Sequence, residues 1–323
     1  MVTIGIPRAG TGQSYGILWK TFFEKLGFNV LFSPETTKEM VDNGVKHCDS
    51  DICFAIKIYV GHVLELKDKV DYVFVPSISD ISEDAKASKF AIRPERIKPD
   101  KQFLCSYHTA LPYLIKNMFP DTKLLIGKLG SDRPEMRIGL FDMMSKQFKK
   151  KEPEMQAAIK EAWEADTKEE NKGAEGNADE WKKAKYKIAL VGADYITKDK
   201  FCLMNMPSLL KKEKAILRNM NHPRKRSEMD RKTAGFYVNW EVEQDVIDRY
   251  FDAIDWKEID GIIYIMPFSC GPCFLFQEQV INENNEKPVL ILNVDESQNE
   301  TRIKTRIEAF MDVIKGKKKG KKK

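Results

Sequence analysis

The order of apolar and polar residues predicts alternating strands and helices in the first part of the chain. Short apolar runs indicate strands, and apolar residues at helical spacing indicate helices with one buried face. The clearest helix follows the first strand, and its apolar face contains Tyr15, Leu18, Trp19, Phe22, Phe23 and Leu26. Predicted strands occupy 2–7, 29–32, 71–75, 103–106 and 124–126, and further predicted helices occupy 36–45 and 51–66.

The same alternation returns in the second part of the chain. Predicted strands occupy 187–191, 215–218, 261–266 and 289–294, with helices near 242–254 and 301–314. The segment between the two parts is highly charged and has few residues typical of strands. The pattern therefore predicts an N-terminal α/β domain (1–132), a charged helical connection (133–184), a C-terminal α/β domain (185–314) and a disordered lysine-rich tail (315–323).

Most of the predicted strands are apolar throughout, without alternation of polar and apolar residues. Such strands are typical of parallel sheets that helices cover on both faces. The sequence therefore predicts an α/β protein with two Rossmann-like or flavodoxin-like parallel-sheet domains joined by a helical segment. The two halves could be structural duplicates.

The positive charge of the chain is concentrated in its last nine residues. They contain seven lysines, and removing these from a net charge of +5 leaves a slightly acidic body with a net charge of −2. A lysine run could contact nucleic acid, an acidic partner or an anionic membrane, but a solvated tail is the commoner case. The body itself gives no reason to expect nucleic-acid binding.

The chain has no apolar run of about 18 residues, so no membrane span is expected. Its first residues lack the basic segment and apolar core of a signal peptide, which predicts a cytoplasmic protein. In a reducing compartment, the six cysteines are expected to be thiols or metal ligands and not disulfides.

Cys270 is the first candidate site residue because of its place in the pattern. It follows a predicted strand in the sequence PFSCGPC and precedes a helical stretch. Open α/β folds bind ligands at this edge of the sheet, where backbone N–H groups and the helix dipole favour a thiolate. Gly271 allows a bulky group to approach the backbone, although a buried apolar cysteine is the alternative.

Cys53 and Cys273 are the next candidates. Cys53 lies near the start of a predicted helix and shares a face with Ile56, so it points at the core or at a domain cleft. Cys273 forms a C-x-x-C pair with Cys270, which could be a redox dithiol or half of a metal site. A zinc site would need a second pair, and the spacing of Cys48 and Cys53 is not typical of one.

A glycine-rich loop, 10–16, follows the first strand. It does not match the dinucleotide fingerprint, because Tyr15 stands where the third glycine is needed, and it lacks the P-loop lysine. With Arg8 beside it, the loop could still hold an anion, although a plain strand-to-helix turn is the commoner case. His62 is expected to pack or to form a hydrogen bond.

Several stretches together resemble one superfamily. It comprises the D-component of 2-hydroxyglutaryl-CoA dehydratase, the benzoyl-CoA reductase subunits and the CoA-protein-activase-related (acyl-CoA dehydratase activase-related) proteins, and the similarity is greatest to the last branch. The similar segments cover most of both predicted domains in order: IGIPRA (4–9), WKTFFEKLGFNVLFSPETTKEMVDNGVK (19–46), CFAIKIYVGHVLELKDKVDYVFVPSI (53–78), LVGADY (190–195), PFSCGP (267–272) and VDESQNETRIKTRIEAF (294–310).

The resemblance implies an oxygen-sensitive iron–sulfur protein of anaerobic metabolism. Its cluster, a [4Fe-4S] cluster or a larger or shared one, would be held by cysteines from both α/β domains. Cys53 and Cys270 would then face each other across the cleft between the domains. The resemblance also implies a partner, an ATP-hydrolysing activase of the actin-like kinase fold that reduces the cluster. It further implies an acyl-CoA substrate and a homo- or hetero-oligomer.

The sequence departs from the family pattern at one expected ligand. Family members usually carry a cysteine before the Lys-Phe of the next segment, where this chain has Ala87 and Ser88. Cys273 could replace that ligand, and Cys105, in the sequence QFLCSYH, is the other candidate. This branch could also have lost its usual cluster.

Three functions therefore compete. The first is an iron–sulfur component, of dehydratase or reductase type, in an ATP-dependent low-potential electron-transfer system. The second is a cluster-poor paralogue that acts as a scaffold or assembly factor in a larger complex, which the missing cysteine favours. The third is a nucleotide or acyl-CoA binder that uses the 10–16 loop. The sequence favours the first and identifies no catalytic acid or base.

Overall fold

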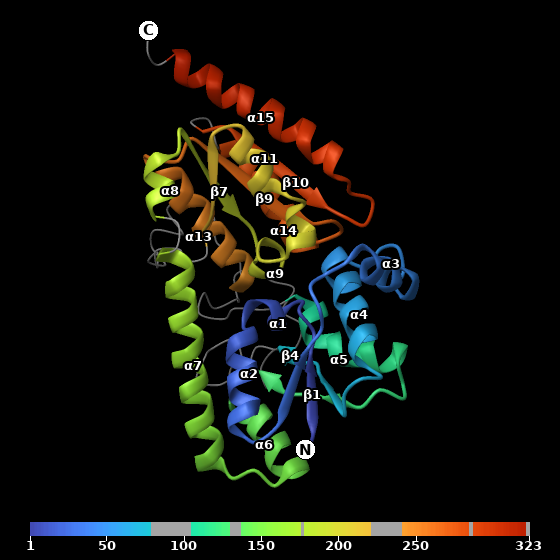
Figure 1. The fold of residues 1–323 in the computed structure, drawn as a ribbon. Helices are drawn as coiled ribbons and strands as arrows, with labels where there is room; N and C mark the ends of the chain where they lie inside the picture. The colour runs from blue at the N-terminus through green and yellow to red at the C-terminus, as the bar shows by residue number, and fades with distance from the viewer. Residues whose placement is uncertain (79–104, 130–136, 176–177, 221–240, 284–286, 321–323) are drawn as a thin grey trace, which may run out of the picture. The chain divides into compact units, whose positions relative to one another are not determined.

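The computed structural model describes residues 1–78, 105–129, 137–175, 178–220, 241–283 and 287–320 (Figure 1). Its internal contacts divide the chain into two compact units, and each unit draws on several stretches of sequence. Unit 1 comprises Met1–Pro34, His62–Glu170 and Tyr237–Gln244, and unit 2 comprises Glu35–Gly61, Asn171–Phe236 and Asp245–Lys323.

Unit 1 is built on a parallel sheet with the strand order β2-β1-β3-β5. These strands are β1 (Thr3–Ile6), β2 (Asn29–Phe32), β3 (Tyr72–Phe74) and β5 (Leu124–Leu125). β1 pairs with β2 from Thr3 opposite Asn29 to Ile6 opposite Phe32. A separate parallel pair is formed by β4 (Ser77–Ile78) and β6 (Lys128–Leu129).

The helices of unit 1 bury the apolar face that the sequence predicts. On α2, Leu18, Trp19, Phe22 and Phe23 are buried, and the Trp19 ring lies 5.0 Å from that of Phe74 in β3. The first half of α7 adds further apolar residues to the same core. The helices of unit 1 are α1 (Thr11–Ser14), α2 (Gly16–Lys25), the end of α4 (Phe54–Leu66), α5 (Ser106–Met118), α6 (Arg137–Phe148) and most of α7 (Glu152–Glu175). The last residues of α7 fall in unit 2.

Unit 2 contains the second parallel sheet, with the strand order β10-β9-β7-β8. These strands are β7 (Tyr186–Val191), β8 (Ala215–Asn219), β9 (Gly261–Pro267) and β10 (Val289–Val294). When the four strands of each sheet are numbered in chain order, both sheets have the order second, first, third, fourth, which is the flavodoxin-like arrangement. The predicted α/β fold with two parallel-sheet domains is therefore confirmed, and the two sheets share one topology.

Helices cover both faces of the unit 2 sheet, which lies between α15 and α13 in Figure 1. The predicted apolar face of α15 is confirmed, because Ile303, Ile307, Phe310, Met311 and Ile314 are all buried. The helices of unit 2 are α3 (Lys38–His47), the start of α4, α8 (Ala178–Lys183), α9 (Asp194–Thr197), α10 (Lys200–Leu203), α11 (Met206–Lys212), most of α13 (Glu241–Asp255), α14 (Gly271–Glu283) and α15 (Glu300–Gly320).

The segment Glu35–Gly61 belongs to unit 2, whereas the sequence places it in an N-terminal domain that ends at 132. Polar contacts hold it there. The Thr36 hydroxyl donates a hydrogen bond to Asp199, and Lys200 pairs with Glu35 at 2.6 Å. These contacts join residues more than 160 positions apart, so the local pattern of apolar residues could not reveal them.

The chain's C-terminal lysines also differ from the prediction. α15 continues to Gly320, where the sequence predicts a disordered tail from 315 onward. Lys318 holds the end of this helix, because its Nζ lies 2.7 Å from the Asp260 carboxylate and donates to the Lys185 carbonyl at 3.1 Å. Among the residues described, none of the helices combines the length and the apolar character needed to cross a membrane.

Two further expectations change at element boundaries. α4 begins at Phe54, so Cys53 stands directly before the helix and not inside one that begins at 51. Ser106 begins α5, so the end of the predicted strand 103–106 is helical. Residues 103 and 104, Ala87, Ser88 and the polar segment 221–235 lie outside the described residues.

Candidate functional site

The site is organised around the carboxyl ends of β7 and β9, the two central strands of the unit 2 sheet. From β7 the chain continues to β8 on one side, and from β9 it continues to β10 on the other. Such a switch point is where open α/β sheets bind their ligands. The residues that follow these two strands are therefore candidates for chemistry.

Three cysteines meet at this edge of the sheet. Cys270 stands between β9 and α14, Cys273 lies in the first turn of α14, and Cys53 directly precedes α4. The Cys270 thiol is hydrogen-bonded to those of Cys53 and Cys273. The three side chains are buried, with 8%, 5% and 8% exposed for Cys270, Cys273 and Cys53.

The backbone holds the two loops that carry these cysteines together. The Phe54 N–H donates to the Phe268 carbonyl at 3.0 Å, next to Cys53 on one side and two residues before Cys270 on the other. Since Cys53 and Cys270 both belong to unit 2, they meet inside one unit. The sequence instead places them across a cleft between two domains, because it assigns Glu35–Gly61 to the first one.

Two of the cysteines occupy the N-terminal ends of helices. The backbone N–H groups of Ala55 and Ile56 act to lower the pKa of the Cys53 thiol, and that of Cys273 acts to lower the pKa of Cys270, although larger causes outweigh them. Unpaired N–H groups and the helix dipole at such positions stabilise a negatively charged sulfur. That the backbone favours a thiolate at Cys270 stays a prediction.

In the absence of a cation, the pKa values of Cys53 and Cys270 nevertheless lie above the usual range of a thiol. The hydrogen bond to Cys270, followed by burial, raises the pKa of Cys53 far above its usual range. The hydrogen bond to Cys273, followed by burial, raises the pKa of Cys270. Neighbouring buried thiols of this kind are poor nucleophiles, and a soft metal that binds them displaces their protons. The arrangement therefore suits metal binding better than nucleophilic catalysis.

A buried positive charge lies one helical turn from Cys53. The Lys57 side chain is 3% exposed, and its Nζ donates to the Ser50 carbonyl at 3.1 Å and pairs with Glu296 at 3.3 Å. Glu296 follows β10, so this ion pair ties α4 to the sheet edge. A lysine here would offset part of the negative charge of metal-bound thiolates.

A fixed carboxylate follows β7 at the same edge of the sheet. Asp194, in the first turn of α9, pairs with Arg249 of α13 and with Lys198 at 2.8 Å. Arg249 Nη1 also donates to the Gly192 carbonyl at 3.1 Å. Burial raises the pKa of Asp194, but the charges of Arg249 and Lys198 outweigh it and hold the pKa below its usual range.

Glu243 is a candidate that the sequence analysis did not single out. It lies in the first turn of α13, in the part of this helix that belongs to unit 1. The side chain is 5% exposed, and burial raises its pKa to about 7. Its Oε2 is buried without a hydrogen-bond partner in the described part of the chain. Acidic residues are favoured in the first turn of any helix, so the sequence alone could not distinguish Glu243 from an ordinary first-turn residue.

The remaining cysteines are placed elsewhere. Cys105 precedes α5 in unit 1 and is half-buried, so its role as a ligand stays a prediction. Cys202 is buried in α10, where burial and then Asp199 raise its pKa well above the usual range. Cys48 is half-buried after α3, and burial raises its pKa to about 11. Within the part of the chain that the structure describes, Cys270 forms its thiol hydrogen bonds with Cys53 and Cys273.

Where the sequence predicts the 10–16 loop, the structure instead has the short helix α1 and the start of α2, and neighbouring polar groups are already engaged. Arg8 Nε donates to the Ser33 carbonyl at 2.9 Å, and its guanidinium lies 4.7 Å from the centre of the Phe32 ring. Ser33 Oγ and His62 Nδ1 are 2.7 Å apart, which confirms His62 as a hydrogen-bonding residue. Burial, with Arg8 nearby, lowers the pKa of His62 to about 3. Anion binding by this loop stays a prediction.

The turn before Cys270 is conformationally strained. Ser269 has φ of 61°, in the left-handed region that serine rarely adopts. Because its side chain is exposed, we expect Ser269→Gly to raise the free energy of unfolding by about 0.5–1 kcal/mol. Urea denaturation measures this change, with Ser269→Ala, which keeps the Cβ atom, as the control. A loss of stability in the glycine variant would show that the serine side chain itself is needed.

The fold and the thiol cluster together define an α/β protein with a candidate metal centre at the switch point of one sheet. A family model described as CoA enzyme activase uncharacterised domain (DUF2229) matches residues 3–219. This match covers more than half of the chain, which therefore belongs to that family. It includes Cys53 and ends before Cys270 and Cys273. No curated protein matches the sequence.

Proposed function

We propose that the thiol cluster of unit 2 binds an iron–sulfur cluster, with Cys53, Cys270 and Cys273 as ligands. The observation that carries this proposal is the contact of three buried thiols at the switch point of the sheet. Sulfur ligands select soft metals such as iron in iron–sulfur clusters, zinc or Cu(I) over hard cations. The resemblance of the chain to iron–sulfur proteins favours the first of these metals.

A [4Fe-4S] cluster takes four protein ligands, so three cysteines leave one position to fill. We propose that this position is filled by Cys105, as the resemblance suggests, or by a residue from a second chain, which would make the cluster a shared one. When bound, the cluster would supply one-electron transfer at low potential.

The chain's own residues would have three tasks. The backbone N–H groups at the starts of α4 and α14 would stabilise the thiolates of Cys53 and Cys270. Lys57 would contribute a positive charge beside them. Burial of all three cysteines would keep water away and so hold the site at low dielectric.

We further propose that the protein is the iron–sulfur component of an ATP-dependent, low-potential electron-transfer system. Membership of a CoA enzyme activase family supports a link to CoA-dependent enzymes. The partner would be an ATP-hydrolysing activase of the actin-like kinase fold, and the related chemistry would be that of 2-hydroxyacyl-CoA dehydratases and benzoyl-CoA reductases. We propose the reducing cytoplasm as its compartment, since free thiols persist there.

The test is anaerobic purification with quantitation of iron and acid-labile sulfide and an absorbance spectrum. We expect a brown protein with about four irons and four sulfides per chain. Cys270→Ala should reduce the iron content to background, because Cys270 contacts both other thiols. Cys202→Ala, which removes a buried cysteine outside the cluster, is the matched control and should keep its iron.

Other outcomes would contradict the proposal in distinct ways. A colourless chain that chemical reconstitution cannot fill would contradict metal binding and would favour a scaffold or assembly factor. Stoichiometric zinc in place of iron would contradict the electron-transfer role. Unchanged iron in Cys105→Ala would contradict the cysteine of unit 1 as the fourth ligand and would favour a residue from a second chain.

A further inference from the structure

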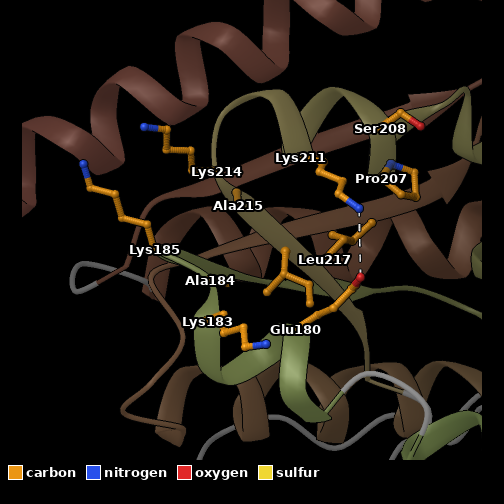
Figure 2. Close-up of a pocket in the computed structure, with 11 residues that line it drawn as sticks. Glu180, Lys183, Ala184, Lys185, Pro207, Ser208, Lys211, Lys214, Ala215 and Leu217 are labelled. Atoms are coloured by element: carbon orange, nitrogen blue, oxygen red, sulfur yellow. Dashed lines mark ion pairs between the residues drawn. The ribbon is translucent and has the colours of Figure 1, made fainter.

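A groove runs along the open edge of the unit 2 sheet (Figure 2). β8 is the last strand of the sheet, so one of its sides has no neighbouring strand among the described residues. The groove has a volume of about 560 Å³, and its floor includes Ala215, Ile216 and Leu217 of β8. α8 and α11 contribute its two walls.

Within the described part of the chain, the outer backbone groups along this edge have no strand to pair with. The Tyr186 N–H donates to the Lys214 carbonyl at 3.2 Å, and the Met220 N–H donates to the Leu190 carbonyl at 3.0 Å. Since hydrogen-bonding direction alternates along a strand, the even-numbered residues of β8 face β7. The N–H and C=O groups of Ala215 and Leu217 therefore point away from β7. Such an edge is a template for an additional strand.

The rim of the groove is positively charged. It carries Lys183, Lys185, Lys211 and Lys214 and one acidic residue, Glu180. Figure 2 shows Lys211 and Glu180 reaching toward each other, and their charged atoms are 3.9 Å apart. Both side chains are largely exposed, at 83% and 64%, so this pair is weak.

The other lysines of the rim lack a carboxylate within ion-pair distance in the part of the chain that the structure describes. Lys185 instead lies over the ring of Tyr186, with its Nζ 5.3 Å from the ring centre. α15 adds charge beside the groove, where Lys318 donates to the Lys185 carbonyl. Lys318 is itself paired with Asp260, so the charge without a counter-charge among the described residues is that of Lys183, Lys185 and Lys214.

We propose that this groove binds an extended acidic peptide of a partner protein, which adds to β8 as a further strand. Its backbone would pair with Ala215 and Leu217, and alternate side chains would place carboxylates against the rim lysines. Its other side chains would cover the apolar floor. The charge complementarity favours an acidic partner, and the unpaired strand edge favours a peptide over a nucleic acid, whose phosphates would engage the lysines alone. This inference does not depend on the iron–sulfur proposal.

The probe for this site is a short fluorescein-labelled peptide of alternating Glu and Val, added to the full chain at low ionic strength. Fluorescence anisotropy should report binding that added salt weakens. The double variant Lys183→Glu and Lys211→Glu should weaken binding by about tenfold. The control variant Lys46→Glu and Lys160→Glu carries the same charge change on exposed lysines outside the groove and should bind like the original chain. Glu180→Gln should strengthen binding, because it frees Lys211.

Amide hydrogen exchange distinguishes an added strand from a charged patch. Bound peptide should slow exchange at Ala215 and Leu217, and a peptide N-methylated at alternate residues should bind at least tenfold more weakly. Equal loss of binding in the two double variants would overturn the proposal. So would binding without slower exchange at Leu217, or displacement of the peptide by a single-stranded oligonucleotide at lower concentration.

Discussion

Gly44→Ala is expected to lower the free energy of unfolding by about 3 kcal/mol. A Cβ atom at Gly44 would lie 1.9 Å from the Lys57 carbonyl oxygen and 3.0 Å from the Gly61 nitrogen. A Cβ atom at Gly61 would lie 2.2 Å from the Met40 carbonyl oxygen. The backbones of α3 and α4 thus touch at these two glycines. No flexible side chain can yield, so the alanine must push the two helices apart.

The same change should disturb the thiol cluster. Cys53 directly precedes α4 and Lys57 lies within it, so a shift of α4 moves the thiol away from Cys270 and strains the ion pair with Glu296. If the chain binds an iron–sulfur cluster, we expect Gly44→Ala to contain less iron than the original protein after anaerobic purification.

Urea denaturation measures the loss of stability as a lower midpoint at an unchanged slope. Gly316→Ala is the matched control, because Gly316 lies on the exposed side of α15 and a Cβ atom there would meet nothing within 4 Å. It should be neutral or stabilising by up to about 1 kcal/mol, since alanine favours a helix. Equal midpoints for Gly44→Ala and the original chain would refute the close approach of α3 and α4.

Arg249→Met is expected to lower the free energy of unfolding by about 3–5 kcal/mol at neutral pH. The Arg249 side chain is 9% exposed and bonds both the Asp194 carboxylate and the Gly192 carbonyl. Methionine fills a similar volume but leaves Asp194 buried with Lys198 as its remaining cation. Because that lysine stays, the lower end of the range is expected.

The pH dependence separates a charge effect from a packing effect. Asp194 has a lowered pKa in the folded protein, so its contribution is present above the ordinary carboxyl pKa of 3.8 and is lost as the pH falls through the lower folded value. Without Arg249, burial should raise the pKa of Asp194 in the folded protein. The free energy of unfolding of the variant should then decrease as the pH rises. The stability difference between the two proteins should therefore widen from acidic to neutral pH.

Denaturation midpoints across that pH range test this expectation. The double variant Arg249→Met and Asp194→Asn should recover part of the loss, because no buried charge remains without its arginine. Lys200→Met, which removes a cation from an ion pair whose side chains are 76% and 61% exposed, is the control and should change stability by about 0.5 kcal/mol or less. A loss that does not vary with pH would assign Arg249 a packing role only.

The sequence by itself determined the class of fold and most of its elements. Helical spacing identified the buried faces of α2 and α15, and apolar runs identified the strands, because burial repeats with the local geometry of each element. It also singled out Cys270 and Cys273, because a position directly after a parallel strand is a property of the local pattern. The local pattern could not decide whether Cys105 is a metal ligand.

The tertiary structure alone decided which residues meet. Cys53 lies beside Cys270, Lys57 beside Glu296 and Arg249 beside Asp194, and these pairs are separated by long stretches of chain. The first two of these contacts join the segment Glu35–Gly61 to the rest of unit 2. The physical reason is that periodicity records whether a side chain is buried but not which partner it is buried against. Polar and ionic partners are fixed by the topology of the sheet, which brings distant loops to one edge.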